Sequence, residues 1–159
     1  MENKNTNPLQ KYFRQPKIYL SLPSSGKYYP AGSLEISENG EYPVFPMTAR
    51  DEIMIKTPDA LLNGQATASV ISSCIPAIKD PFSMPSMDLD ACLIAIRIAT
   101  YGEKMDISIK VPVTGDDKDF DIDLRIMLDQ FSNVEYNNAI QLDDMVVNLR
   151  PLSYREFTE

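Results

Sequence analysis

The sequence SMDLDACLIAIRIATYG, residues 86–102, contains the longest dense apolar stretch of the chain. If it is helical, its large apolar residues fall on nearly all sides: Leu89, Leu93, Ile94, Ile96 and Ile98. A helix of that kind lies in the centre of a domain, covered by other elements. Ser86 is a candidate N-cap and Gly102 supplies a C-terminal stop. We therefore predict a central helix over Asp88–Tyr101.

Three further helices are predicted before the central one. Thr48 and Asp51 form a capping pattern ahead of the apolar residues at 53–55. Thr57-Pro58-Asp59 has a cap candidate, a proline at the first helical position and an acid in the first turn, as a second helix start would. Residues 65–75 are rich in Ala, Ser, Val and Ile, and such small residues suit close packing against a neighbouring helix. These signals predict a cluster of helices.

Antiparallel hairpins are predicted to flank this cluster. Apolar and polar residues alternate along 105–111 and 120–124, which predicts a hairpin with one acidic, wet face and one dry face. Asn39-Gly40 lies between the segments 34–37 and 42–46, and Asn-Gly in that setting is a strong hairpin signal.

The expected fold class is therefore α+β, with a central helical cluster, flanking antiparallel β-hairpins and extended terminal arms. We expect an N-terminal arm over residues 1–16, a single globular domain over 17–149 and a C-terminal tail over 150–159. The two ends are expected to be ordered mainly by other chains, because their apolar residues are scattered or have little chain left to cover them.

Composition excludes several function classes. The 159 residues carry 15 Lys and Arg against 23 Asp and Glu, a net charge of −8, which argues against nucleic acid or an anionic membrane as the main partner. The chain has no histidine, so it has no Ser-His-Asp triad and no imidazole metal site.

Cys74 and Cys92 each lie in an apolar stretch and are expected to be two buried thiols. No secretory signal is visible, and no apolar stretch is long enough to span a bilayer.

Arg97 is the unusual polar residue of the central helix. A buried guanidinium requires anionic partners, and the acids free to approach are Asp51, Glu52 and Asp59. We expect Arg97 to be largely buried in a structural ion pair with at least one of them. A partner-binding or catalytic arginine is the alternative.

Aromatic clusters near the two ends are candidate interface residues: Tyr28, Tyr29, Tyr154, Arg155 and Phe157. Tyr and Arg are favoured anchors of protein interfaces. The alternative is that these side chains cover the domain's own core.

Two segments resemble ligand-binding loops but lack residues that such loops require. Ser24-Ser25-Gly26-Lys27 lacks the earlier glycine and the following Ser or Thr of a phosphate loop. The aspartates at 116–123 lack the glycine and glutamate positions of a calcium loop, and alternate as the solvent face of a strand does. We therefore expect no cofactor, no metal site and no catalytic residue.

Four strings, taken in order, resemble one family: Leu22-Pro23-Ser24-Ser25-Gly26-Lys27-Tyr28-Tyr29-Pro30, Thr57-Pro58-Asp59-Ala60-Leu61-Leu62-Asn63-Gly64, Ile71-Ser72-Ser73-Cys74-Ile75-Pro76, and the run from Asp90 to Gly102. They resemble the baseplate hub and hub-assembly proteins of large contractile-tailed bacteriophages, the T-even-like group. The resemblance covers about residues 18–125 and implies a non-enzymatic role in the tail baseplate. It implies a virion location, with host cytoplasm as the site of assembly, and other tail proteins as partners.

One departure from the family bears on metals. Where many members carry a Cys-Pro-x-Cys-like knuckle, this chain reads Val111-Pro112-Val113-Thr114-Gly115, with no thiolate or imidazole for zinc.

Three functions remain open: a structural hub component, a transient hub-assembly factor, and, from another class, an enzyme acting through carboxylates such as Asp51, Glu52 and Asp59.

Overall fold

In the computed structural model, which describes residues 13–58, 64–113, 115–133 and 136–159, helix α4 spans Ser86–Tyr101 and forms the centre of the body. One face of α4 consists of small buried residues, Ala91, Ala95 and Ala99, which allow neighbouring elements to approach closely. Pro85 occupies the N-cap position, so the prediction that Ser86 caps the helix is wrong by one residue. Gly102 ends the helix as predicted, with its N–H bonded to the Ile98 carbonyl.

Helices α1, Ala49–Ile55, and α3, Gln65–Cys74, pack against each other, and α3 also contacts α4. Both lie where the sequence predicts helices. The predicted cap of α1 is a full capping box, in which the Thr48 hydroxyl accepts from the Asp51 N–H and the Asp51 carboxylate accepts from the Thr48 N–H. The second predicted helix start at 57–59 runs into residues 59–63, which lie outside the described residues.

The Asn39-Gly40 signal predicts the turn correctly but the wrong strand partner. Strand β2, Glu41–Val44, pairs antiparallel with β1, Ile18–Ser21, and Leu34 makes only an isolated bridge with Ile78. The reason is burial, because pairing β2 with β1 places Leu20 and Val44 in the core against α4.

Apolar side chains from these elements form one core around α4. Its most deeply buried large members are Leu20, Val44, Val70, Ile71, Ile75, Ile78 and Met84. Each such side chain contributes roughly 1.5–3 kcal/mol through burial. Cys74 and Cys92 are free and buried in this core, as predicted. No helix in the described ranges is both long and apolar enough to cross a membrane.

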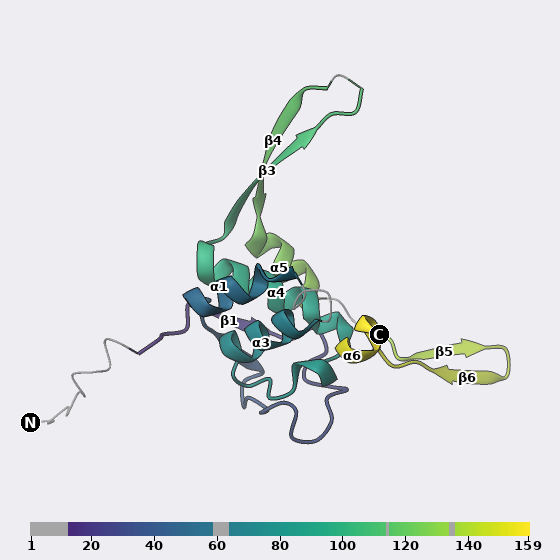
Figure 1. Ribbon diagram of the computed structural model, residues 1–159. Helices are drawn as coiled ribbons and strands as arrows, with labels where there is room; N and C mark the ends of the chain where they lie inside the picture. Colours follow the sequence, from purple (N-terminus) through teal and green to yellow (C-terminus); the bar gives the residue numbers. More distant parts are fainter. Residues whose placement is uncertain (1–12, 59–63, 114, 134–135) are drawn as a thin grey trace, which may run out of the picture.

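Two β-hairpins project from the body in different directions (Figure 1). The first pairs β3, Lys104–Lys110, with β4, Asp117–Asp123, in the predicted antiparallel arrangement. Helix α5, Leu124–Ser132, follows it and packs on α4. The second hairpin pairs β5, Ala139–Leu142, with β6, Met145–Asn148.

The C-terminal residues do not form a loose tail. Helix α6, Tyr154–Thr158, packs against the short 3-10 helix η2, Pro81–Ser83, and against α4. The chain before α6 is bonded to the body, since the Tyr154 N–H donates to the Met84 carbonyl and the Ser86 N–H to the Leu152 carbonyl, both at 2.7 Å. A capping box between Ser153 and Glu156 starts the helix, and Tyr154 is buried. These interactions correct the expectation that other chains order this segment.

The N-terminal arm is described only from residue 13. There, Arg14 is anchored on the body: its guanidinium donates to the carbonyls of Pro46 and Ser73, the latter at 2.9 Å, and lies 3.8 Å from the Asp51 carboxylate. Residues 1–12 lie outside the described residues.

Candidate partner-binding surface

The loop between β1 and β2 is held to α4 by one buried carboxylate. Asp88, in the first turn of α4, accepts hydrogen bonds from the Ser24 N–H at 2.8 Å, the Ser24 hydroxyl at 2.6 Å and the Tyr29 hydroxyl at 2.9 Å. Burial raises the pKa of Asp88 above its ordinary range, and these hydrogen bonds oppose that rise. Burial, and next the Asp88 charge, also raise the pKa of Tyr29. This network holds the loop on α4, and Tyr28 of the same loop is exposed.

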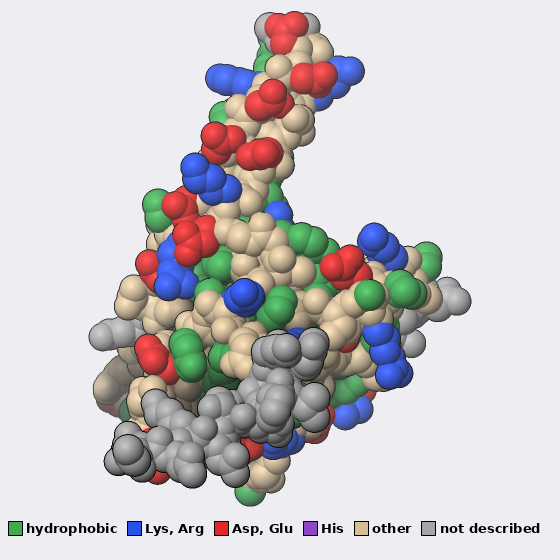
Figure 2. All heavy atoms as spheres, turned by 90° about the vertical axis from the view of Figure 1, so that its left-hand side faces the viewer, with side chains coloured by type: hydrophobic (Ala, Val, Ile, Leu, Met, Phe, Trp, Pro, Cys, Tyr) green, Lys and Arg blue, Asp and Glu red, His purple; other side chains and the backbone are tan. Residues whose placement is uncertain are grey.

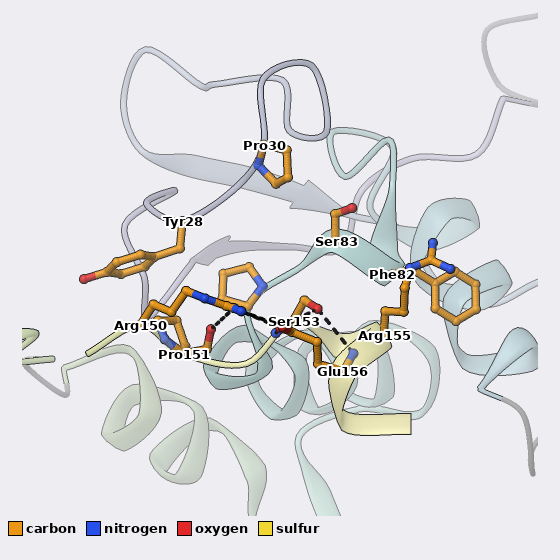
Figure 3. A pocket seen from close by; sticks show the side chains of 10 residues that line it. Tyr28, Pro30, Phe82, Ser83, Arg150, Pro151, Ser153, Arg155 and Glu156 are labelled. Atoms are coloured by element: carbon orange, nitrogen blue, oxygen red, sulfur yellow. Dashed lines mark hydrogen bonds and ion pairs between the residues drawn. The ribbon is translucent and has the colours of Figure 1, made fainter. Parts of the chain in front are cut away.

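The fixed loop forms one wall of a surface pocket of about 500 Å³ (Figure 3). The opposite wall comes from the segment leading into α6, so that Tyr28 and Arg155 line the same pocket although they lie near opposite ends of the chain. The full lining is Tyr28, Pro30, Phe82, Ser83, Pro85, Arg150, Pro151, Ser153, Arg155 and Glu156. Three prolines and two aromatic rings make this surface largely apolar and stiff.

Most charged groups of the pocket are paired with each other. The Arg150 guanidinium makes two bonds to the Glu156 carboxylate, which also accepts from the Ser153 N–H at 2.8 Å. The Arg150 bond and charge, with the bonds from Ser153, hold the pKa of Glu156 well below its usual range. The Arg155 guanidinium instead lies over the Phe82 ring, 5.1 Å from its centroid. The arrangement presents an aromatic and proline surface with one guanidinium, which suits binding to a protein segment.

The five predicted interface residues have different environments. Tyr28 and Arg155 are exposed on the pocket, and Phe157 is exposed beside it in a neighbouring hollow with Tyr136. Tyr154 is buried, and its ring stacks on Phe82 with centroids 5.7 Å apart. Tyr29 points inward to the Asp88 carboxylate. Thus three of the five are available to a partner, and the other two belong to the protein's own packing.

Arg97 does not pair with Asp51 or Glu52, two of its three predicted partners. It is partly buried, and within the described part of the chain it makes no ion pair. Its guanidinium lies over the Tyr101 ring, 4.6 Å from the centroid, and Nη1 is buried with no hydrogen-bond partner. Glu52 instead lies near Tyr101, because burial, and next the negative charge of Glu52, raise the pKa of the Tyr101 hydroxyl.

The Asp51 carboxylate is hydrogen-bonded to groups other than Arg97. Its carboxylate accepts from the Thr48 N–H and hydroxyl, both at 2.8 Å, and from the Ser73 hydroxyl at 3.0 Å, with Arg14 nearby. Asp59, the third predicted partner, lies outside the described residues. Across the described ranges, no group of three His, Cys, Asp or Glu side chains is arranged to hold a metal ion.

The β3–β4 hairpin has one acidic face and one apolar face, as the alternation predicts. Pairing brings Met105 opposite Ile122 and Ile107 opposite Phe120 on one face. The other face carries acids at alternate positions of β4, and there Asp106 lies directly opposite Asp121. Figure 2 shows acidic side chains along this projecting arm. The apolar face is not dry as predicted, because the hairpin projects from the body and Ile109 and Phe120 are exposed on it.

Sequence reasoning missed two residues that organise the site. The first is Asp88, although a carboxylate at the start of a nearly all-apolar helix is a signal for a buried polar network. The second is Arg14, which lies in the predicted N-terminal arm, and no local pattern marks its contacts with Pro46 and Ser73.

One of three comparisons with known proteins found a match. The family model described as T4 bacteriophage base plate protein matches residues 15–159, nearly the whole chain. No curated protein and no solved structure gives a significant match. The matched range includes the β1–β2 loop, η2 and residues 150–156, all of which contribute to the lining of the pocket. The chain belongs to the T4 bacteriophage base plate protein family.

Proposed function

We propose that this protein is a non-enzymatic structural component of the hub region of the tail baseplate, where it docks other tail proteins. Membership of the family makes it a phage baseplate protein, and hence part of a multi-subunit assembly of the virion tail. The hub location and the docking role are the further steps of the proposal.

The observation that supports it best is the character of the pocket between the Tyr28 loop and α6. Its carboxylate, Glu156, is already bonded to Arg150 and Ser153. What the pocket offers outward is the Tyr28 ring, proline surface and the Arg155 guanidinium. Aromatic and arginine side chains over a rigid apolar floor are the usual anchors of protein interfaces.

The test uses phage whose own copy of the gene is inactivated and is replaced by a variant. Tyr28→Ala combined with Arg155→Ala removes two anchors, which should weaken docking about 10- to 100-fold. Lys27→Ala, a neighbouring exposed residue outside the Asp88 network, is the matched control. The amount of the chain in purified baseplates, measured by quantitative mass spectrometry, should fall for the double variant only. Equal incorporation of both variants would contradict docking through this pocket.

The same surface would serve a transient hub-assembly factor that leaves before the virion is complete. The measurement separates the two roles. A structural component is present in finished tails at a fixed ratio to other baseplate proteins. An assembly factor is present in hub intermediates and absent from finished tails.

A further inference from the structure

The β5–β6 hairpin has an uncovered apolar face. Its register pairs Ile140 with Val147 and Leu142 with Met145, and directly paired residues of an antiparallel ladder share one face. The exposed fractions are 45% for Ile140, 53% for Leu142 and 65% for Met145. Within the described residues, neither strand packs appreciably on an element other than its partner strand. An isolated two-stranded hairpin is at best marginally stable in water, so a covering partner would stabilise it.

The opposite face is also almost uncharged. It carries Ala139, Gln141, Val146 and Asn148, and Val146 is exposed. The other projecting hairpin of the same molecule gives the contrast. Residues 104–123 carry charged side chains along their length, whereas residues 137–149 carry only Asp143 and Asp144, side by side at the turn. Charged side chains at alternate positions are typical of a hairpin with a solvated face. Neither face of the β5–β6 hairpin has such a row of charged side chains.

We propose that the β5–β6 hairpin inserts into an apolar cleft of a different tail protein, with Lys or Arg side chains at the inner end of the cleft facing Asp143 and Asp144. This deepens the proposed docking function and rests on it. Both neutral faces then become buried, and the two acids at the tip meet opposite charge. The open edges of β5 and β6 add backbone groups that a strand of the partner can pair with.

A cleft fits better than a second copy of this chain. Each strand has four residues, about 14 Å long, and the two strands lie about 5 Å apart. One face of such a hairpin is far smaller than the roughly 800 Å² per partner of a stable interface. Two copies, each with a net charge of −8, would also repel each other. A cleft that encloses both faces contacts more of the hairpin than a single face does. Basic residues in the cleft also attract this negatively charged chain, whereas a second copy would repel it.

The first experiment places a photocrosslinking amino acid at residue 142 of the full chain, in phage whose own copy is inactivated. Irradiated baseplates and hub intermediates should yield a crosslink to another tail protein, at an apolar segment bordered by Lys or Arg. The control position is Asp119, on the charged face of the other hairpin. A crosslink to a second copy of this chain, or equal crosslinking from both positions, would overturn the proposal.

The second experiment reverses the charge at the tip. Asp143→Lys with Asp144→Lys should reduce incorporation into baseplates and hub intermediates about tenfold or more, because like charges then meet in the cleft. Glu103→Lys with Asp106→Lys, two exposed acids at the start of the other hairpin, is the matched control and should cost little. Thermal melting checks that each variant is folded, since Asp143 has φ of +49° in the turn.

The outcomes distinguish the two proposals. If the wild-type chain enters baseplates, residue 142 forms no crosslink and the tip variant incorporates normally, the hairpin proposal fails and the docking function stands. If the wild-type chain is found in neither baseplates nor hub intermediates, the docking function fails, and the hairpin proposal falls with it.

Discussion

The Ser24 hydroxyl donates to the Asp88 carboxylate across 2.6 Å, and both residues are buried although 64 positions separate them. This contact, with those of the Ser24 N–H and the Tyr29 hydroxyl, joins the β1–β2 loop to the start of α4. The same loop carries Tyr28, which lines the pocket that we propose as a docking surface.

Removing this carboxylate should destabilise the protein strongly. In Asp88→Ala, the Ser24 N–H and the hydroxyls of Ser24 and Tyr29 lose their acceptor inside the core. Buried groups left unpaired cost about 1–3 kcal/mol each, but removal of the carboxylate also relieves the cost of burying its charge, so we expect a net loss of about 2–4 kcal/mol in the free energy of unfolding, measured with urea. Asp90→Ala, an exposed acid in the same helix, is the control and should change it by about 0.5 kcal/mol or less. A similarly small effect at Asp88 would contradict the role of the network.

Asp51 should make the protein sensitive to acid. Burial raises the pKa of Asp51, but hydrogen bonds from Thr48 and Ser73 and the charge of Arg14 outweigh burial, so that the net pKa lies below the ordinary 3.8. The folded state therefore binds this proton less tightly than the unfolded state. The Asp51 contribution to the free energy of unfolding is therefore complete above the ordinary pKa of the unfolded state. It is lost as pH falls toward the lowered pKa of the folded state.

The measurement compares wild type with Asp51→Asn in urea unfolding from neutral pH down to about pH 3. The wild type should be more stable at neutral pH, and the difference should shrink as pH falls. A difference that stays constant with pH would show that the Asp51 charge contributes nothing.

Arg97 should tolerate an uncharged replacement. Its guanidinium stacks on Tyr101 and leaves Nη1 without a partner, so Arg97→Met keeps the apolar stem and removes an unsatisfied buried group. We expect a change of about 1 kcal/mol or less in the free energy of unfolding, the size of a cation–π contact. Tyr101→Leu removes the same contact from the other side and should cost a similar amount. A loss of about 3–5 kcal/mol in Arg97→Met would instead indicate the buried ion pair expected from the sequence.

The sequence predicts those elements whose signals are local. The all-apolar pattern identifies α4, the Thr48–Asp51 spacing identifies the start of α1, and strict alternation identifies the β3–β4 hairpin. Ser153 and Glu156 carry a capping-box pattern too, so the start of α6 had a usable local signal that was missed.

The candidate site was less predictable, because tertiary contacts build it. Tyr28 and Arg155 were singled out separately, and only the fold shows that they line one pocket. Nothing local in the sequence directs Ser24 to Asp88 or Arg14 to Pro46. The β1–β2 pairing likewise follows from which side chains the core can bury, and a turn signal alone does not contain that information.

The docking of α6 depends on the absence of a side chain at Gly64. This residue has φ of +71°, and an added Cβ would lie 2.9 Å from the Tyr154 hydroxyl oxygen. Gly64→Ala should therefore destabilise the protein by about 1 kcal/mol for the backbone conformation and further for the clash. Gly40→Ala is the matched control, because Gly40 has φ of +74° and open space around it. By hydrogen exchange, the amides of residues 153–158 should lose protection in Gly64→Ala and keep it in Gly40→Ala. Equal protection in the two variants would show that α6 does not need the close approach of Tyr154 to Gly64.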